Sequence, residues 1–598
     1  MPVGFQPKKL LLMMWLPVLA AGCNLIPQRQ TPGLTDTYAY MYGARDPEWL
    51  NRFSPGFQTA IDGYRQNLTA VSPTALQERV IFMQDYAARL TTADTTRWSD
   101  LLAWETLRYE LRQATEGMPY VLYDFPLDPA EGIHLQIIRA FVQYHPLKTQ
   151  DDCTHYLIRM QAIAPKLAGV VKLMNKRLEA GYIPPRELME ASLLQLTSLQ
   201  ALPPDQHPLY QLFARRISGV DPVEVNTYEA VEYLKTIEVR LRESVYPAYN
   251  SLITTLKQHL NATQGASADT AAYRWVLRGY TGEDRPLMSW QASLASQVNT
   301  CQTPILQLLD SLGLRTGPLP QRLRQASRPL APVSAPPEAR MNTLISEARA
   351  RVAEAASITS GLFHEVPPVR MHIAEVPDYL QASPAWIWYT SPALDGSRQA
   401  ALWLHPELVR ELPAWALSAH IYAQAYPGRY LLEASWQQHK TEHPGDLMRD
   451  MPWLTGGWSL YAAWMMENDL HWYSREPYER LGYLHLMLTQ AGLAVVDAGL
   501  HGGGLTPAAA QAYLHQQCGM EDEAARQAVM QVLCTPGQAV AAWMGFETLR
   551  QARQEVETRL NKQFFLPDFH QFIQQLGPVP TPVFKKALQY YIRQKMAG

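Results

Sequence analysis

Apolar residues spaced three and four positions apart run through most of the first half of the chain, and this spacing constrains the fold more than any other feature. One stripe covers roughly six helical turns, at Leu157, Met160, Ile163, Leu167, Val170, Met174 and Leu178. Such a stripe predicts a single amphipathic helix that buries one face. Gly181 and the pair Pro184-Pro185 follow it and predict its end.

Similar apolar faces predict further helices at 75–90, 97–114, 230–260 and 289–312. No fixed-period repeat relates these segments. We therefore predict an N-terminal helical region over residues 39–316. Residues 317–340 are rich in proline, which predicts a connection to a second region at 341–598.

The second region opens with a predicted helix at 341–358, after which the pattern changes. Short runs of aromatic and branched residues predict three strands, at Val369–Ala374, Ala385–Tyr389 and Ala400–Leu404. Residues 394–397 carry a turn signal between the last two. A helix follows at 411–440, and the chain is helical again from 458. The sequence thus predicts a mainly α fold with a small β-sheet beside one helix.

Composition supplies a large core and argues against nucleic-acid binding. Hydrophobic residues make up 47% of the chain, charged residues 18%, and the net charge is −3. A protein that binds phosphate backbones carries a basic patch, and no run of Lys and Arg stands out after the N-terminus. We expect no nucleic-acid partner.

The N-terminus has the pattern of a secretory signal. Lys8 and Lys9 precede an apolar run at Leu10–Ala21, which ends in small residues. The run is shorter than the about 20 apolar residues that a membrane-spanning helix needs. We predict a cleaved signal peptide over residues 1–22.

The end of this signal resembles the bacterial lipoprotein box. Leu19 to Cys23 carry the resemblance, although Leu19 lies one position further upstream than usual. We predict a lipid on Cys23, a tether over 23–38 and attachment to a membrane through the lipid. Asn24 after the cysteine favours the outer membrane, with the protein facing the periplasm. An ordinary cleaved signal with an incidental cysteine is the alternative.

Four cysteines remain after the signal, and their state depends on the compartment. They are Cys153, Cys301, Cys518 and Cys534. In an oxidising periplasm they can form two disulfides, and Cys518 with Cys534 is the favoured pair because the two are close in sequence. Buried thiols are the alternative.

Seven short motifs resemble one bacterial family in their order and spacing. They are Tyr156–Gln161, Gly181–Arg186, Pro392–Arg398, Gly457–Tyr461, Val495–His501, Pro536–Ala539 and Phe569-His570. The family is called domain of unknown function 885 and belongs with the gluzincin-like metallopeptidases. The resemblance runs from about Asp36 to the end of the chain. It implies a mostly helical, zincin-like fold with a deep cleft, and a zinc site built on the motif His-Glu-x-x-Pro-Gly-His-His.

The chain departs from that motif at its chemical positions. Ala423 stands in the place of the first His and Gln424 in that of the catalytic Glu, while Arg429 and Tyr430 replace the later His pair. Alanine and arginine offer no lone pair to a metal, and glutamine cannot act as a base. Pro427-Gly428, which shapes the backbone, is retained.

The departures continue downstream. Gly456 and Ala463 replace two carboxylates of the family motif, and Ala542 and Trp543 replace a Tyr-Lys pair. The resemblance therefore implies a metallopeptidase scaffold from which the metal ligands and catalytic residues are missing. We expect no catalytic residue and no bound metal in this chain, although zinc is expected in active relatives.

Other residues offer an alternative metal site. His439 and His443 match the order His-x-x-Glu-His, and His420 lies three residues before Ala423. Pro444 moves His443 away from a helical conformation, which favours a solvated helix end over a metal site. A lone His such as His420 is more often a core residue than a ligand.

Retained family positions and aromatic residues mark a candidate cleft. Asp497, His501 and Gln538 lie in retained motifs, and we expect His501 to brace the cleft by hydrogen bonding. Trp458 and Tyr461 suit a peptide- or glycan-binding cleft, but their helical spacing favours ordinary core packing.

These patterns together predict a lipid-anchored envelope protein with a peptidase-derived, catalytically inactive domain that binds a peptide or an envelope partner. Arg429 is predicted to pair with a ligand carboxylate or a nearby acidic side chain. A metal-dependent hydrolase that uses His420, His439 and His443 is the alternative, and a purely structural scaffold is the third reading.

Overall fold

The computed structural model describes residues 34–53, 68–90, 98–220, 225–262, 269–330, 334–394, 396–439 and 444–597. The predicted signal peptide, the lipidation site Cys23 and most of the tether lie outside these residues, and so does His443.

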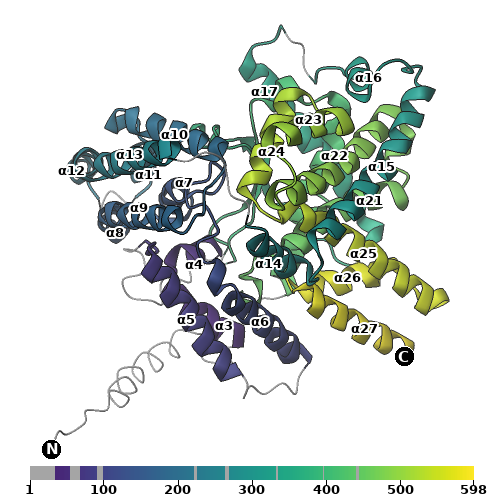
Figure 1. Cartoon of the computed structure of the whole chain (residues 1–598), viewed down its shortest axis with the longest axis horizontal. Helices are drawn as coiled ribbons and strands as arrows, with labels where there is room; N and C mark the ends of the chain where they lie inside the picture. The colour runs from purple at the N-terminus through teal and green to yellow at the C-terminus, as the bar shows by residue number, and fades with distance from the viewer. Residues whose placement is uncertain are drawn as a thin grey trace, which may run out of the picture.

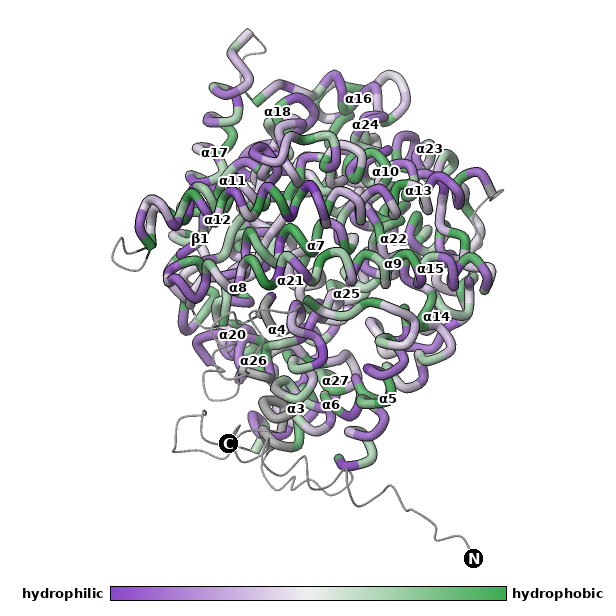
Figure 2. The backbone as a smooth tube through the Cα atoms, turned by 90° about the vertical axis from the view of Figure 1, so that its left-hand side faces the viewer, coloured by the Kyte–Doolittle hydropathy of each residue, from purple (hydrophilic) through white to green (hydrophobic). Residues whose placement is uncertain are grey.

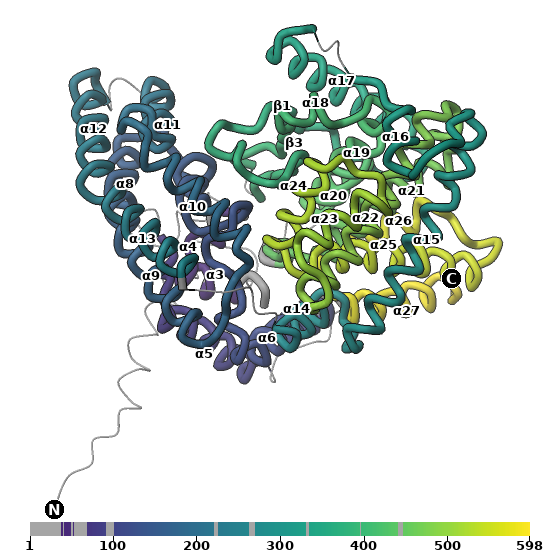
Figure 3. The backbone as a smooth tube through the Cα atoms, turned by 45° about the horizontal axis from the view of Figure 1, so that its top comes forward, coloured from purple at the N-terminus to yellow at the C-terminus, as the bar shows by residue number. Residues whose placement is uncertain are grey.

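The chain forms two helical halves that face each other (Figures 1 and 3). The first half contains α3 (Leu34–Gly43), α4 (Pro47–Phe53), α5 (Pro73–Arg89), α6 (Trp98–Glu116), α7 (Ile133–Arg139), α8 (Gln150–Gln161), α9 (Ile163–Glu179), α10 (Arg186–Ala201), α11 (Pro208–Ile217), α12 (Thr227–Arg240) and α13 (Tyr246–Ala262). Its main core runs from Leu68 to Leu260. Apolar and polar residues alternate along most of these helices in Figure 2, as expected of helices with one buried face.

The single helix predicted across residues 157–178 is in fact two helices, which is a correction. α8 ends at Gln161, and α9 begins at Ile163. Pro165 explains the break, because proline lacks the N–H that a continuous helix needs and its ring clashes with the carbonyl four residues earlier, here that of Gln161. The stripe of apolar side chains still faces one core.

The second half contains α14 (Thr270–Thr281), α15 (Leu287–Ser311), α16 (Leu319–Ala326), α17 (Pro337–Ile358), α18 (Leu408–Glu411), α19 (Leu417–Gln424), α20 (Arg429–His439), α21 (Pro452–Asn468), α22 (Pro477–His501), α23 (Pro507–Cys518), α24 (Asp522–Cys534), α25 (Gln538–Leu560), α26 (Leu566–Leu576) and α27 (Thr581–Ala597). Residues of α14, α15 and α16 belong to the core of this half. The two cores therefore divide between α13 and α14, ahead of the proline-rich segment 317–340.

Among the described residues, one three-stranded sheet accompanies the helices. It consists of β1 (Met371–Glu375), β2 (Ile387–Thr390) and β3 (Ala400–Leu404), in the order β1-β3-β2. β3 runs parallel to β1 and antiparallel to β2, with Trp388 opposite Trp403. β2 contacts α19 and is an edge strand of the sheet. The predicted mainly α fold with a small sheet beside one helix is confirmed.

The helix predicted over 411–440 is broken into α18, a 3-10 turn, α19 and α20, which corrects that prediction. The break between α19 and α20 spans residues 425–428. A Cβ at Gly428 would lie 1.8 Å from the Ala423 carbonyl oxygen, so only glycine permits the chain to pass this close to the end of α19.

α22 is long and apolar enough to cross a membrane by length and composition. It is the central helix of the second half, where it packs against α15, α23, α24 and α25. Its length and composition therefore fit a core helix.

Candidate functional site

A large cleft lies between the two halves and has a volume of about 1780 Å³. Its walls come from α4, α7 and the segment at 121–128 in the first half. In the second half they come from β2, α20 and the loop before α25. The cleft is larger than a typical small-molecule pocket, which has a volume of roughly 300–1,000 Å³.

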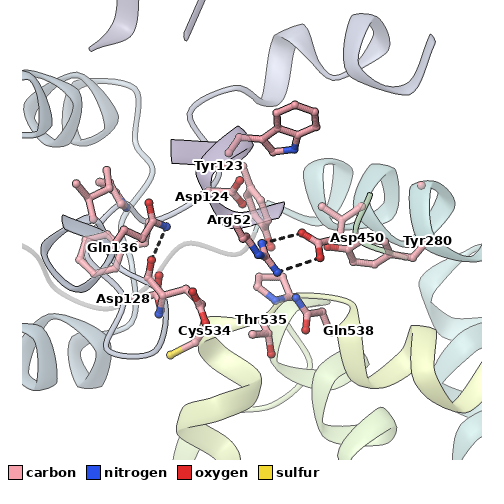
Figure 4. A pocket seen from close by; sticks show the side chains of 18 of the residues that line it. Arg52, Tyr123, Asp124, Asp128, Gln136, Tyr280, Asp450, Cys534, Thr535 and Gln538 are labelled. Atoms are coloured by element: carbon pink, nitrogen blue, oxygen red, sulfur yellow. Dashed lines mark hydrogen bonds and ion pairs between the residues drawn. The ribbon is translucent and has the colours of Figure 1, made fainter. Parts of the chain in front are cut away.

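Part of the cleft is shown from close by in Figure 4, where Asp128 lies beside Cys534. Burial raises the pKa of Asp128 to about 6 and that of the Cys534 thiol well above its usual range. The Asp128 carboxylate accepts hydrogen bonds from the backbone N–H groups of Ala130 and Glu131. Burial at these two positions therefore favours the neutral forms of Asp128 and Cys534.

Two ion pairs join the halves near the cleft. Arg52 of α4 donates to Asp450 at 2.8 and 3.0 Å (Figure 4), and Arg449 donates to Glu110 of α6 at 2.8 Å. Arg52 and Asp450 are about half exposed, so their pair adds little to stability, whereas the Arg449 side chain is only 6% exposed. The Arg449–Glu110 pair therefore contributes more to stability than the Arg52–Asp450 pair.

The residues at the position where the resemblance implies a zinc motif occupy the turn between α19 and α20. Ala423 is 2% exposed and lies in the core, while Gln424 ends α19 and is half-buried. Arg429 begins α20 and lines the cleft. Its Nε donates to Oε1 of Glu433 at 2.9 Å, and its guanidinium lies 5.2 Å from the centre of the Tyr389 ring. Of the two partners predicted for Arg429, the structure shows the acidic side chain.

This ion pair holds both charges at the cleft wall. Burial alone would lower the pKa of Arg429, but the Glu433 carboxylate outweighs it, so the pKa is raised and the guanidinium stays charged. Four residues separate the two side chains on α20, which places them on one face of the helix.

The neighbouring side chains brace the turn. The Tyr430 hydroxyl donates to the Pro368 carbonyl and accepts from the backbone N–H of Arg370, both at 2.7 Å. Trp458 donates its indole N–H to the Pro427 carbonyl at 3.1 Å. Tyr430 and Trp458 therefore fix α20 against the sheet and against α21.

Close helix packing surrounds Gly456 and Ala463, the positions at which the resemblance implies carboxylates. A Cβ on Gly456 of α21 would lie 2.7 Å from the Cβ of Ala542 on α25, and one on Gly457 would meet the backbone of Gly545 at 2.5 Å. Small residues thus let α21 and α25 approach closely. Ala463 of α21 is fully buried in the same core.

The side chains at this site do not fit a zinc ion. Zinc is held by nitrogen, sulfur or carboxylate oxygen ligands, whereas Ala423, Gly456 and Ala463 have none and Arg429 is a cation already paired with Glu433. The described part of the chain holds no group of three or more His, Cys, Asp or Glu arranged to bind a metal ion.

The described histidines of the alternative metal site have other surroundings. His420 is half-buried, and burial lowers its pKa to about 4. Its charge lowers the pKa of His485 on α22 in turn. His439 ends α20, and its Nδ1 lies 2.8 Å from the Ser435 carbonyl. Nothing in the described residues joins His420 and His439 in one ligand group.

Of the five residues predicted to line the cleft, three lie in the core and two line the cleft. Trp458, Tyr461 and Asp497 are fully buried, and Tyr461 hydrogen-bonds to His570 at 2.9 Å. His501 and Gln538 line the cleft. The Nε2 of His501 lies 3.0 Å from the Val532 carbonyl, so its ring is tied to the end of α24.

Asp497 has a structural role that the sequence alone did not indicate. Its carboxylate accepts hydrogen bonds from the backbone N–H groups of Gly537, Ala539 and Val540 and from the Tyr273 hydroxyl, at 2.9 to 3.2 Å. These N–H groups lie at the start of α25, so Asp497 caps that helix from α22. Burial raises its pKa.

All four cysteines are free thiols in the described part of the chain, so the favoured Cys518–Cys534 disulfide is not formed. Cys518 is fully buried against Gly492 of α22, while Cys534 lines the cleft. The two side chains thus have different surroundings, and their proximity in sequence does not bring them into a disulfide.

Several cleft residues were not predicted from the sequence, among them Arg52, Glu433, Trp436 and Asp450. Only Glu433 had a usable signal, because it lies four residues after Arg429 on a predicted helix. Arg52 and Asp450 are 398 positions apart and meet only in the folded chain.

The family described as "Bacterial protein of unknown function (DUF885)" matches residues 55–588 of this chain. The chain belongs to this family, as its motifs predicted. No curated protein matches the chain.

Two solved structures share the fold. One is described as "the putative lipoprotein from Colwellia psychrerythraea", with a TM-score of 0.84 and 19% identity over 94% of this chain and 100% of that chain. The other, described as "a putative lipoprotein of unknown function from Shewanella oneidensis", has a TM-score of 0.67 and 15% identity over 94% and 99%. At these identities the likeness shows the fold alone.

Proposed function

We propose that this protein is a cell-envelope lipoprotein whose metallopeptidase-derived cleft binds a peptide segment without cutting it. The observation that carries the proposal is the Arg429–Glu433 ion pair, which occupies the cleft wall at the family's zinc motif. Arg429 cannot bind a metal, and Gln424 at the end of α19 cannot serve as the base that activates water. The cleft itself remains large.

The shape and lining of the cleft support a peptide as its ligand. The edge strand β2 lies along it with Trp388, Tyr389 and Thr390 in the wall. An edge strand can pair with an extended peptide through main-chain hydrogen bonds, while neighbouring pockets take its side chains. The same wall combines the aromatic side chains of β2 with charged ones such as Arg429 and Glu433, so it offers both apolar surface and polar partners to a peptide.

The location rests on the N-terminus. The predicted lipid on Cys23 and tether over 23–38 would hold the helical body near a membrane, and Asn24 favours the outer membrane. The names of the two structural neighbours agree with this assignment. A binding role near a membrane surface fits a protein that presents a cleft to the periplasm.

The mature lipoprotein, purified in detergent without added metal, tests this proposal. We expect it to retain members of a random decapeptide pool and to release them uncut. Trp388→Ala in the cleft should reduce retention, whereas Tyr228→Ala on α12, where the side chain is 73% exposed, should not. Failure to retain any peptide, or retention that Trp388→Ala leaves unchanged, would overturn it. Chelator-sensitive cleavage of the pool would instead support the alternative hydrolase built on His420, His439 and His443.

A further inference from the structure

The last forty residues of the chain differ in charge from everything before them. From Arg559 to Gly598 the sequence holds six Lys and Arg side chains and one acidic residue, Asp568, which gives a formal charge of +5. Because the whole chain carries −3, the residues before Arg559 carry −8. A charge asymmetry of this kind indicates contact with an anionic surface.

The fold brings part of this charge to one corner of the molecule. Five residues separate the end of α25 at Leu560 from the start of α26 at Leu566. Lys595, near the end of α27, donates to the Asp568 carboxylate in the first turn of α26 at 2.7 Å. The ends of α25 and α27 and the start of α26 therefore meet.

The exposed side chains where these helices meet are basic and apolar. We call them the C-terminal corner, and they are Arg559, Lys562, Phe565, Arg593, Lys595 and Met596. Phe565 is 56% exposed and Met596 is 54% exposed. Large apolar side chains among exposed cations are typical of protein surfaces that enter the headgroup region of a bilayer.

Acidic side chains neutralise only part of the charge at the C-terminal corner. Lys595 pairs with Asp568, and Arg559 lies 3.5 Å from Glu555. Both ion pairs are partly exposed, so they hold their cations weakly. Lys562 and Arg593 form no ion pair with any side chain in the described part of the chain. These two cations can therefore bind an anionic partner without breaking an ion pair of that kind.

The predicted lipid anchor would keep this corner close to a membrane. α3 begins at Leu34, eleven residues after Cys23. An extended chain spans at most about 3.6 Å per residue, so the start of α3 would lie within about 40 Å of the bilayer. In two perpendicular views, α3 and the C-terminal end of the chain both lie on the lower side of the molecule (Figures 1 and 2).

We propose that the C-terminal corner contacts the surface of an anionic phospholipid membrane. Lys562 and Arg593 bind lipid phosphates, and Phe565 and Met596 enter the headgroup region. Each cation close to an anionic membrane favours binding by about fivefold. The exposed apolar side chains favour a bilayer over a soluble acidic protein, because a bilayer takes up both kinds of group. This inference rests on the proposed envelope location and goes beyond the proposed peptide binding.

The first test measures binding to vesicles without help from the lipid anchor. It uses the mature chain, residues 23–598, with Cys23→Ser so that no lipid is attached. Vesicles of phosphatidylglycerol and phosphatidylcholine in equal amounts should bind this protein about twentyfold more tightly than vesicles of phosphatidylcholine alone.

Variants of the same protein assign the contact to the corner. Lys562→Gln combined with Arg593→Gln should weaken binding to the anionic vesicles by about twentyfold, because it removes two cations. Lys235→Gln combined with Arg242→Gln on α12 is the matched control, since both side chains are 65% exposed, and it should leave binding unchanged.

The apolar part of the contact has its own variant and control. Phe565→Ala should weaken binding to the anionic vesicles by about fivefold, because about half of the ring surface is free to enter the bilayer. Tyr228→Ala on α12 should have no effect.

A second measurement uses the lipidated wild-type protein, so it does not depend on the folding of a variant. In vesicles that contain a photoactivatable phosphatidylglycerol, crosslinks should form around Phe565 and Met596 and not on α12.

The outcomes separate this inference from the proposal on which it rests. Equal binding to both kinds of vesicle, or binding that Lys562→Gln with Arg593→Gln leaves unchanged, would overturn the membrane contact. Tighter binding of soluble polyglutamate than of anionic vesicles would also overturn it, in favour of an acidic protein partner. A mature protein without a lipid on Cys23 would instead contradict the envelope location and would leave the vesicle result standing.

Discussion

The packing of α21 against α25 yields a direct test of how closely these helices approach each other at Gly456. In Gly456→Ala the new Cβ would lie 2.7 Å from the Cβ of Ala542, whereas carbon atoms in contact are normally about 3.5–4.0 Å apart. Overpacking of this kind costs ~1–3 kcal/mol. The gain in helix propensity from glycine to alanine is about 1 kcal/mol, so the net destabilisation should be ~1 kcal/mol.

A double-mutant cycle measured by urea denaturation separates these two effects. Ala542→Gly removes the clashing methyl group, so it should rescue part of the Gly456→Ala loss, with a coupling of ~1–2 kcal/mol. Gly361→Ala is the matched control, because a Cβ there meets nothing within 4 Å. If Gly456→Ala is stabilising by about 1 kcal/mol and shows no coupling to Ala542→Gly, the close approach of α21 and α25 is refuted.

Three further predictions concern charged groups. Asp497→Ala leaves three N–H groups at the start of α25 and the Tyr273 hydroxyl without their acceptor. The free energy of unfolding measured in urea should therefore fall by ~3–4 kcal/mol. A loss below about 1 kcal/mol would contradict the cap. Arg429→Ala leaves the Glu433 carboxylate buried and without its ion-pair partner. The free energy of unfolding, measured by thermal unfolding, should fall by ~1–2 kcal/mol, and Arg429→Lys should restore part of it. Unchanged stability would disprove a structural role for the pair. Because the pKa of Asp128 is raised to about 6 in the folded state, its protonated form stabilises the fold at low pH, and this stabilisation is lost as the pH rises from about 4 through 6. Asp128→Asn should therefore be more stable than the wild type at pH 7 by ~1–2 kcal/mol but not at pH 4, and an equal difference at both pH values would contradict the shift.

Much of the fold could be predicted from local patterns, because helices and strands with one buried face have a periodic sequence. The strands at 371–375, 387–390 and 400–404 and the helix α17 lie close to their predicted positions. The failures had local causes as well. Pro165 interrupts a continuous apolar stripe, and Gly428 allows a turn inside the segment that was predicted as one helix.

The site was less predictable than the fold. The family motifs located the turn at Ala423–Tyr430, and the residue types there predict that it holds no zinc ion. The cleft itself is built from residues that are far apart in sequence, such as Arg52 and Asp450, and no local pattern brings them together. The cap at Asp497 is of the same kind, because its partners belong to another helix.

The central proposal is that the metal site implied by the resemblance is closed in this chain and that the cleft binds without catalysis. Elemental analysis of the mature lipoprotein, purified without added metal, tests it most directly, with peptide cleavage measured on the same sample with and without a chelator. We predict zinc well below one atom per chain and no chelator-sensitive cleavage. One zinc atom per chain together with chelator-sensitive cleavage would contradict the claim.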